Sequence, residues 1–231
     1  MIATPLRAEA SDTAEQVSEL LPGEPFAILD IAAGWAWGYA VADHRVGYIE
    51  AIELTDPLEP THRVVEAMAP IQPEPDPLAP PLSHLPMGSR LHGTRHGAML
   101  AIEGGFVPLS YLRPEGEHDE DPADVAQRLL NAPWLPGGRT CHGIDACGLV
   151  QLALQLCGVG APREIDLLRA IGETLPANAP LRRGDLVVCG DLPGLMIDDQ
   201  LVIHVGERLG RVIVEPLHCI GDALERRRVV G

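Results

Sequence analysis

The sequence predicts an α+β protein in which two small antiparallel β-barrels precede a domain of helices and a sheet. Residues 22–57 and 89–112 hold short alternating apolar runs broken by turn residues, which is the pattern of a small barrel or sandwich. Residues 122–231 instead give two helical patterns followed by a series of strands. We therefore expect three domains. They are a first barrel with an N-terminal extension over 1–57, a second barrel over 58–117, and the α+β domain over 118–231.

Composition narrows the class of protein and of partner. The chain has 231 residues, of which 46% are hydrophobic and 22% charged, so we expect a folded protein with a real core. Seventeen basic and 33 acidic residues give a net charge of −16, which disfavours nucleic acid and anionic membrane surfaces as partners. No segment has the roughly 18 apolar residues of a membrane-spanning helix, so no membrane insertion is expected. As written, the chain lacks a signal peptide and is expected in the cytoplasm, or in the cell envelope if a leader was removed.

The cysteines indicate neither a disulfide framework nor a metal site. The chain has five of them and no C-x-x-C pair. We expect reduced, mostly buried thiols, no bound metal and no cofactor.

Strands are expected along the first half of the chain. The runs "PFAILDIA", "WAWGYAVA" and "VGYIEAI" are separated by turn residues. Residues 72–86 hold six prolines in 15 positions, so a loop without regular structure is expected there. The stretch 89–112 returns to the strand–turn–strand pattern, with Gly104 and Gly105 at a tight turn.

These two segments are similar to bacterial SH3-like domains, the small barrels appended to many cell-wall enzymes. The resemblance rests on "GEPFAILDIAAGWAWGYAVADHRVGYI" and on "LPMGSRLHG" with "GGFVPLSYL". Two interpretations of Trp35 and Trp37 stay open: an aromatic platform facing a ligand, or one ring packed in the barrel and one covering its end.

The character of the chain changes after an acidic linker at 115–121. Pro122 opens the run "ADVAQRLL", whose apolar spacing predicts a short helix. A second helix is expected from about Ala146 to Leu156, with Asp145 as its N-cap and glycines 158 and 160 after its end. The runs "GDLVVCG", "PGLMID", "LVIHV" and "RVIVEPL" then predict four strands.

This layout resembles the NlpC-type cell-wall endopeptidases, which are papain-like cysteine peptidases. In that family "G-[IL]-D-C-S-G-L-V-Q" places the nucleophilic cysteine at a helix N-terminus, and here the stretch reads "GIDACGLVQ". The resemblance therefore puts Ala146 at the nucleophile position and Cys147 at the following serine position. Since one step along a helix turns a side chain by about 100°, Cys147 is expected to face the core.

The resemblance also locates the base. In the family a histidine follows "GDL", and a polar residue 12 positions later orients it. Matching "GLMID" to "GIMLD" puts Leu192 at the base position and His204 at the orienting position. A second alignment makes His204 the base, but the next histidine, His218, comes 14 residues later.

Other family markers are altered too. The "Y-x-W-G-G" segment appears as "WLPGG", so Trp134 and Pro136 replace the tyrosine and tryptophan. "PREIDLL" keeps Pro162, Arg163 and Asp166 but lacks the glutamine of the family segment.

We therefore interpret the chain as a catalytically inactive homologue of a peptidoglycan stem-peptide endopeptidase. Its expected role is to bind a muropeptide or a protein partner in the former active-site groove. The residues expected to contact that ligand are Trp35, Trp37, Trp134, Asp145, Cys147 and His204. Two alternatives stay open. One is an active cysteine endopeptidase for D-Glu-γ-diamino acid bonds that uses Cys147 with His204 or His218, and the other is an engineered Cys-to-Ala form of an active enzyme.

Overall fold

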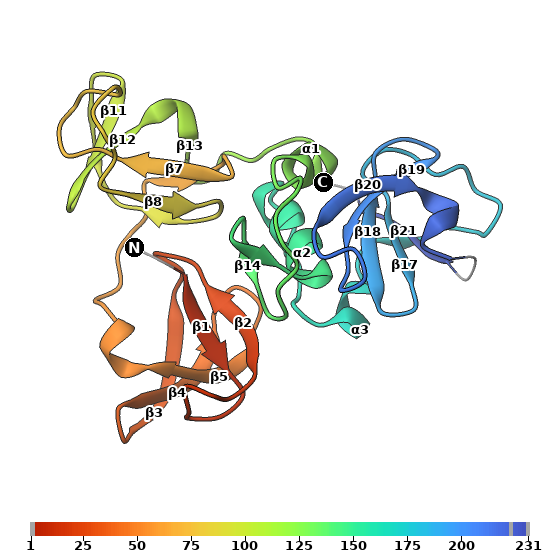
Figure 1. Ribbon diagram of the computed structural model, residues 1–231, viewed down its shortest axis with the longest axis horizontal. Helices are drawn as coiled ribbons and strands as arrows, with labels where there is room; N and C mark the ends of the chain where they lie inside the picture. Colours follow the sequence, from red (N-terminus) through yellow and green to blue (C-terminus); the bar gives the residue numbers. More distant parts are fainter. Residues whose placement is uncertain (1–2, 222–223, 230–231) are drawn as a thin grey trace. The chain divides into compact units, whose positions relative to one another are not determined.

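The computed structural model describes residues 3–221 and 224–229 and divides into two compact units, 1–117 and 118–231. Strands dominate both units, and the helices α1, α2 and α3 all belong to the second (Figure 1). The α+β class is thus confirmed, with more strand than helix.

The first unit begins with a five-stranded antiparallel sheet in the order β2-β1-β5-β4-β3. Its strands are β1 (Thr4–Arg7), β2 (Gln16–Leu20), β3 (Phe26–Ala32), β4 (Trp35–Ala40) and β5 (Val46–Glu50). Leu6, Ala36 and Ile49 are buried together on its inner face. The sheet is open, with β2 and β3 at its edges, so the closed barrel expected here is not what the strands form.

The three strands predicted in this segment are confirmed as β3, β4 and β5. The hairpin of β1 and β2 was not predicted, because its residues lie in a mostly polar stretch without sustained alternation. Pairing with β5 places β1 in the sheet through contacts that are remote in sequence.

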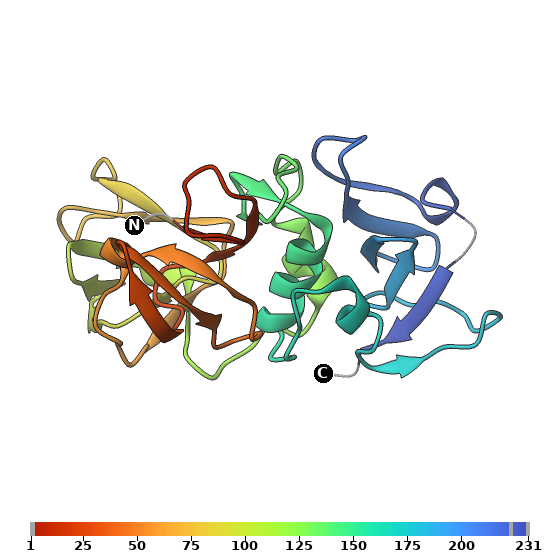
Figure 2. The same ribbon diagram turned by 90° about the horizontal axis from the view of Figure 1, so that it is seen from below.

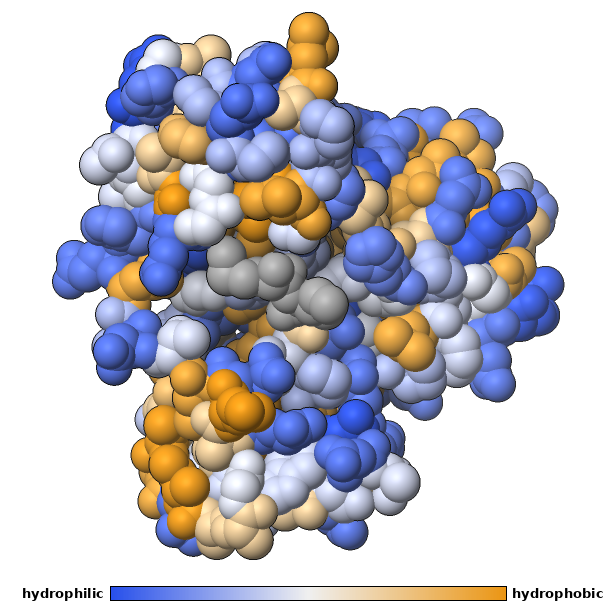
Figure 3. All heavy atoms as spheres, turned by 60° about the vertical axis from the view of Figure 1, so that its left-hand side comes forward, coloured by the Kyte–Doolittle hydropathy of each residue, from blue (hydrophilic) through white to orange (hydrophobic). Residues whose placement is uncertain are grey.

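The edge strand β3 exposes apolar side chains. Ile28, Leu29 and Ile31 are 46%, 57% and 56% exposed, and Trp37 of the neighbouring strand is 39% exposed. A bulge between Ile28 and Asp30 interrupts the pairing with β4. Figure 3 shows apolar side chains gathered on the lower lobe of that view, which this first sheet occupies.

The rest of the first unit consists of three small sheets around a shared core. They are β7-β8, β10-β11-β12 and β13-β6-β9. Val64, Leu85, Leu100 and Val107 are buried in that core. Here too the sheets are separate and no closed barrel is formed. The strand bounds are β6 (His62–Val64), β7 (Met68–Ile71), β8 (Ser83–Pro86), β9 (Arg90–Leu91), β10 (Thr94–His96), β11 (Met99–Ile102), β12 (Gly105–Pro108) and β13 (Leu112–Pro114), with 3₁₀ turns η1 (Ala51–Glu53) and η2 (Leu109–Tyr111).

The proline-rich stretch is only partly a loop. Its last four residues form β8, which pairs with β7 in the register Met68↔Pro86 to Ile71↔Ser83. The prediction of a loop over 72–86 was therefore wrong at its C-terminal end. Pro86 can lie in β8 because it is the last residue of a strand that is paired on one side only. The glycine turn is confirmed, with Gly104 at φ 89° between β11 and β12.

The second unit packs helices on a six-stranded antiparallel sheet in the order β16-β21-β17-β18-β19-β20. Helix α2 packs against β18, β19 and α1. Figures 1 and 2 show α1 and α2 together beside this sheet. The bounds are α1 (Pro122–Gln127), β14 (Arg139–Thr140), β15 (Gly143–Ile144), α2 (Ala146–Leu156), α3 (Ile165–Leu168), β16 (Glu173–Thr174), β17 (Leu186–Cys189), β18 (Leu192–Met196), β19 (Leu201–Val205), β20 (Val212–Pro216), η3 (Leu217–Cys219) and β21 (Leu224–Arg228).

Both predicted helices and all four predicted strands of this unit are confirmed. Helix α3 and the strands β16 and β21 were not predicted. The run "LERRR" of β21 has no apolar alternation, and its pairing with β17 is what makes it a strand. Its arginines bind other segments: Arg228 forms an ion pair with Asp185 at 2.8 Å, and Arg227 donates to Thr174 and to the carbonyl of Arg169.

The five thiols are less buried than expected, since four are half-buried and Cys219 is exposed. Among the helices in the described ranges, none has the length and apolar character needed to cross a bilayer.

Candidate functional site

The start of helix α2 is the centre of the candidate site. Ala146 is its first residue and is half-buried. The helix forms because Leu149, Leu152 and Leu156 recur at helical spacing and are all buried. A residue at this position lies where the unpaired amides and the helix dipole favour negative charge. Alanine has no group that can use that field.

Asp145 caps the helix and is fully engaged. Its Oδ1 accepts from the Gly148 amide at 2.7 Å, and its Oδ2 accepts from the Gly137 amide at 2.8 Å. The same Oδ2 forms an ion pair with Arg163 at 2.5 Å, and the Arg163 side chain is only 5% exposed. Asp145 thus joins three segments of the chain, which is a structural role for a residue expected to contact a ligand.

Cys147 is poorly suited to act as a nucleophile. Burial raises the pKa of the Cys147 thiol to about 11, and the negative charge of Asp145 adds to the rise. Asp191 acts in the same direction, while Arg163 and Arg169 act in the opposite one. The thiolate is the reactive form, so at neutral pH this side chain remains a thiol.

Leu192 is the first residue of β18, directly after a tight turn from β17. Strand β18, which Leu192 opens, packs against α2. Arg169, which follows α3, binds this turn through the Gly190 carbonyl at 2.5 Å and Asp191 at 3.3 Å. The chain therefore brings Leu192 into the neighbourhood of α2, but with an aliphatic side chain.

His204 lies on β19, beside the strand that carries Leu192. A Cβ added at Gly194 of β18 would lie 3.1 Å from the His204 Cβ, so these two positions are neighbours across the strands. A Cβ at Gly206, two residues beyond His204, would lie 3.6 Å from the Leu192 Cδ1. Because side chains two residues apart point to the same face of a strand, Leu192 and His204 share one face of the sheet.

The two nitrogens of His204 are in different environments. Its Nε2 lies 2.8 Å from the Glu215 Oε1 of β20. Its Nδ1 is buried and has no hydrogen-bond partner among residues 3–221 and 224–229. With Glu215 ionised, Nε2 carries the proton and donates, so Nδ1 is left as an unused acceptor. Burial lowers the pKa of His204, and Glu215 acts in the opposite direction. The net lowering favours the neutral ring.

The expected aromatic residues do not all belong to one unit. Trp134 is half-buried in the second unit, where its amide donates to the Gly210 carbonyl at 2.9 Å and its backbone pairs with Ile144. Trp35 and Trp37 belong to the first unit, on the outer face of its sheet. A shared rim of the three rings stays a prediction. His218, on η3, is exposed.

Two residues of the site were missed by sequence reasoning. Glu215 holds His204, and Arg169 binds the turn before Leu192. Glu215 could have been found from the alternation of "VIVEP", which marks it as the polar member of a predicted strand. Nothing in the sequence around Arg169 singles it out.

Comparison with known proteins agrees with this architecture. A family model described as the bacterial dipeptidyl-peptidase Sh3 domain matches residues 6–54. An NlpC/P60 family protein from Bacillus cereus is similar in structure with a TM-score of 0.83 and 15% identity, covering 99% of this chain and 97% of that one. The chain has the NlpC/P60 fold.

Other NlpC/P60 structures match less closely. NlpC1 from Trichomonas vaginalis has a TM-score of 0.50 at 16% identity, with 99% of this chain and 89% of that chain covered. RipD from Mycobacterium tuberculosis, described as a non-catalytic NlpC/p60 domain protein adapted to peptidoglycan binding, has a TM-score of 0.38 at 23% identity, covering 48% of this chain and all of that one. None of the curated proteins compared with the chain matches it. The NlpC/P60 fold with an N-terminal bacterial SH3 domain is what the sequence motifs predicted.

Proposed function

We propose that this NlpC/P60-like protein is catalytically silent and binds muropeptides through the surface around the start of α2. The observation that carries the proposal is the combination of Ala146 as the first residue of α2 with the unpartnered Nδ1 of His204 beside Leu192. If Leu192 has replaced a catalytic histidine, then His204, at the orienting position, has no imidazole to bind, and its Nδ1 is left without a partner. Both halves of nucleophile activation are then missing.

Two features oppose the alternative of an active peptidase. The raised pKa of Cys147 keeps that thiol protonated, and the burial of His204, at 1% exposure, keeps its ring away from a substrate. An engineered Cys-to-Ala change would account for Ala146 but not for Leu192, Trp134 and Pro136.

The catalytic half of the proposal is tested with the stem peptide L-Ala-γ-D-Glu-diamino acid. We expect no cleavage by the full-length protein when products are followed by mass spectrometry. Cleavage that is abolished by Cys147→Ser would instead establish the relocated nucleophile.

A gain-of-function variant sharpens this test. In Ala146→Cys/Leu192→His a thiol would stand at the helix start, and an imidazole could use the free acceptor of His204. General-base assistance is worth about 10²–10⁴-fold, so we expect the double variant to cleave faster than Ala146→Cys alone by a factor in that range. Equal rates in the two variants would contradict the assigned role of position 192.

The binding half is tested by tryptophan fluorescence. We expect a saturable change on titration with muropeptide that is lost in Trp134→Phe. Trp134 is the reporter because its backbone is paired to the residue before Asp145. A saturable change only with a protein partner would favour the partner alternative, and no change with either would leave the unit without a binding role.

A further inference from the structure

The first unit contains a pocket that the NlpC-type resemblance does not assign. Its volume is about 450 Å³, within the range of roughly 300–1,000 Å³ that is usual for small-molecule sites. Ala3 and residues from β1, β4, β5 and η1 line it: Thr4, Pro5, Arg7, Trp35, Glu50 and Glu53. All of them belong to the first unit, so the pocket is complete within that unit.

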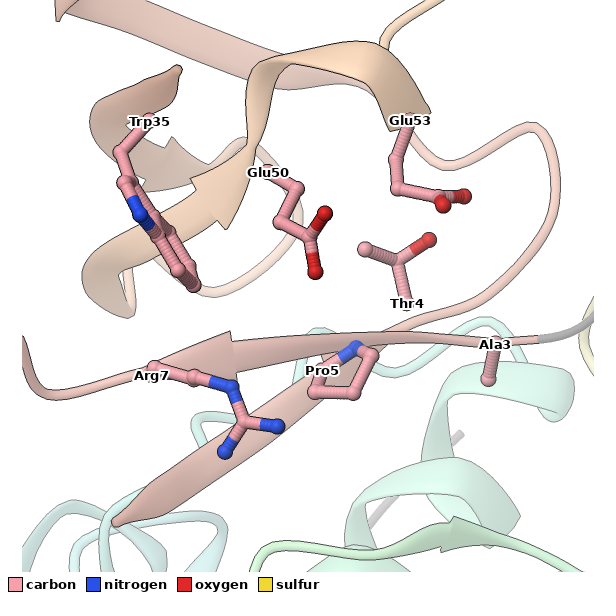
Figure 4. Close-up of a pocket in the computed structure, with 7 residues that line it drawn as sticks. All are labelled: Ala3, Thr4, Pro5, Arg7, Trp35, Glu50 and Glu53. Atoms are coloured by element: carbon pink, nitrogen blue, oxygen red, sulfur yellow. The ribbon is translucent and has the colours of Figure 1, made fainter. Parts of the chain in front are cut away.

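Two carboxylates face the same space in this pocket. Glu50 ends β5 and pairs across the sheet with Trp35, and Glu53 ends the turn η1. Figure 4 shows the Glu50 carboxylate between the Trp35 indole and Thr4, with Glu53 above Thr4. Neither side-chain carboxylate makes a hydrogen bond or an ion pair with any residue of 3–221 or 224–229. Like charges that share a space repel, and a cation bound between them removes that repulsion.

The remaining walls favour an organic cation over a metal ion. Two carboxylates are few for Ca²⁺, which takes about six to eight oxygen ligands, and no group of three or more possible metal ligands lies among the described residues. The Trp35 indole offers a metal ion nothing, but its face attracts an alkylammonium group by a cation–π interaction. The Thr4 hydroxyl lines the pocket and can accept a hydrogen bond from an ammonium N–H group.

Arg7 also lines the pocket, and its Nη1 donates to the Ala14 carbonyl at 2.9 Å. Figure 4 shows its guanidinium on the opposite side of β1 from the two glutamates, so it does not occupy the space beside their carboxylates.

We propose that this pocket binds the primary ammonium group of an aliphatic ligand, held between Glu50 and Glu53 with its chain against Trp35. The proposal concerns the first unit alone and does not depend on the function proposed for α2. It assigns Trp35 to ligand binding, one of the two interpretations that the sequence left open.

The test uses the indole N–H signals of the full-length protein in ¹H–¹⁵N NMR spectra, with Trp35→Phe identifying the Trp35 signal. Titration with 1-aminopentane is expected to shift that signal saturably, while the uncharged analogue 1-pentanol leaves it in place. Glu50→Gln and Glu53→Gln are each expected to weaken binding about two- to fivefold, the range of exposed ion pairs. The matched control Glu9→Gln, an exposed glutamate outside the pocket, should bind as the unaltered protein does.

Further probes separate the sources of the ammonium group. Nα-acetyl-L-lysinamide presents it on a side chain, and triglycine amide presents it at a chain terminus. Binding of either supports the proposal and names the source. Equal shifts with 1-pentanol, no binding of any amine, or unchanged affinity in the Glu50→Gln/Glu53→Gln double variant would each overturn it.

Discussion

Cys147 lies one residue after the start of α2, yet the pKa of its thiol is raised where an activated thiol would have a lowered pKa. Burial and the charge of Asp145 outweigh the help of Arg163 and Arg169, and its pKa rises to about 11. The capping carboxylate that stabilises the helix start is therefore one of the groups that keeps the thiol protonated.

This pKa predicts slow alkylation. Relative to a thiol with the ordinary value of 9.0, two units leave about 100-fold less thiolate at neutral pH. We expect iodoacetamide to modify Cys147 about that much more slowly in the folded protein than after unfolding in urea, as measured by peptide mass spectrometry. The exposed Cys219 is the internal comparison, and modification of Cys147 at the rate of Cys219 would contradict the prediction.

His204 predicts acid sensitivity of a definite sign. Its pKa is lower in the folded protein than the ordinary value of 6.5, so below that value the unfolded chain binds more protons. The free energy of unfolding should therefore fall as pH drops from 6.5 toward the folded pKa and level off below it. We expect a weaker fall in His204→Gln, whose side chain keeps a donor for Glu215, when urea unfolding is compared between pH 7.5 and pH 5. Identical pH dependence in both proteins would show that His204 does not titrate in this way.

At the scale of the element, α2 begins where it does because Asp145 satisfies two amides and one guanidinium at once. Loss of an N-cap typically costs about 0.5–2 kcal/mol, and removal of one partner from a buried ion pair costs more. The helix start is thus a junction between α2, the glycine turn at Gly137 and the segment of Arg163.

Asp145→Ala is accordingly expected to lower the free energy of unfolding by about 2–4 kcal/mol in urea titrations followed by circular dichroism. Asp166→Ala provides the control. It removes the ion pair between Asp166 and Arg169, in which the Asp166 side chain is 85% exposed, so the free energy of unfolding should fall by less than about 1 kcal/mol. Losses of equal size in the two variants would rule out the junction role.

Elements with a strong local pattern were predictable from the sequence, and α2 is the best example. Its cap, its first residue and its last residue all agree with the apolar spacing and the flanking Asp and Gly residues. Strand β21 could not be predicted, because a run of arginines becomes a strand only by pairing with β17. Barrel closure also depends on pairing between strands that are remote in sequence. Alternation predicts the strands but does not determine whether the first and last of them pair, so closed barrels were expected where the sheets are open.

For the candidate site, the motif spacing proposed Ala146, Leu192 and His204. The structure places the last two on one face of the sheet, and their roles stay a prediction. The partner of His204 was not predictable, because Glu215 is brought beside it by the β19–β20 register. Asp145 looked like a ligand-binding residue because a sequence does not show that a carboxylate is already occupied.

At the scale of the whole molecule, charge and exposed apolar surface act against each other. The net charge of −16 keeps copies apart, while β3 presents an unpaired apolar edge. Salt screens the repulsion over about 10 Å at 0.1 M and leaves the apolar attraction in place.

We therefore expect self-association to rise between 20 mM and 500 mM NaCl in sedimentation velocity experiments, conditions chosen to span about 20 to 4 Å in screening length. Leu29→Lys should suppress the rise by placing a charge on the edge strand. Leu78→Lys alters a leucine that is 90% exposed in a loop and should not suppress it. Equal behaviour of the two variants would exclude β3 as the contact.

The position of β21 has a consequence for how the protein is made. This strand lies between β16 and β17, although residues 190–223 separate it from β17 along the chain. Domains usually fold as units during synthesis, at about 5–20 residues per second. Here the sheet lacks an inner strand until Arg228 has left the ribosome, so α2 and its site cannot be locked in place while the earlier strands emerge. The second unit can therefore complete its folding only after β21 has been synthesised, when the first unit has long been available to fold.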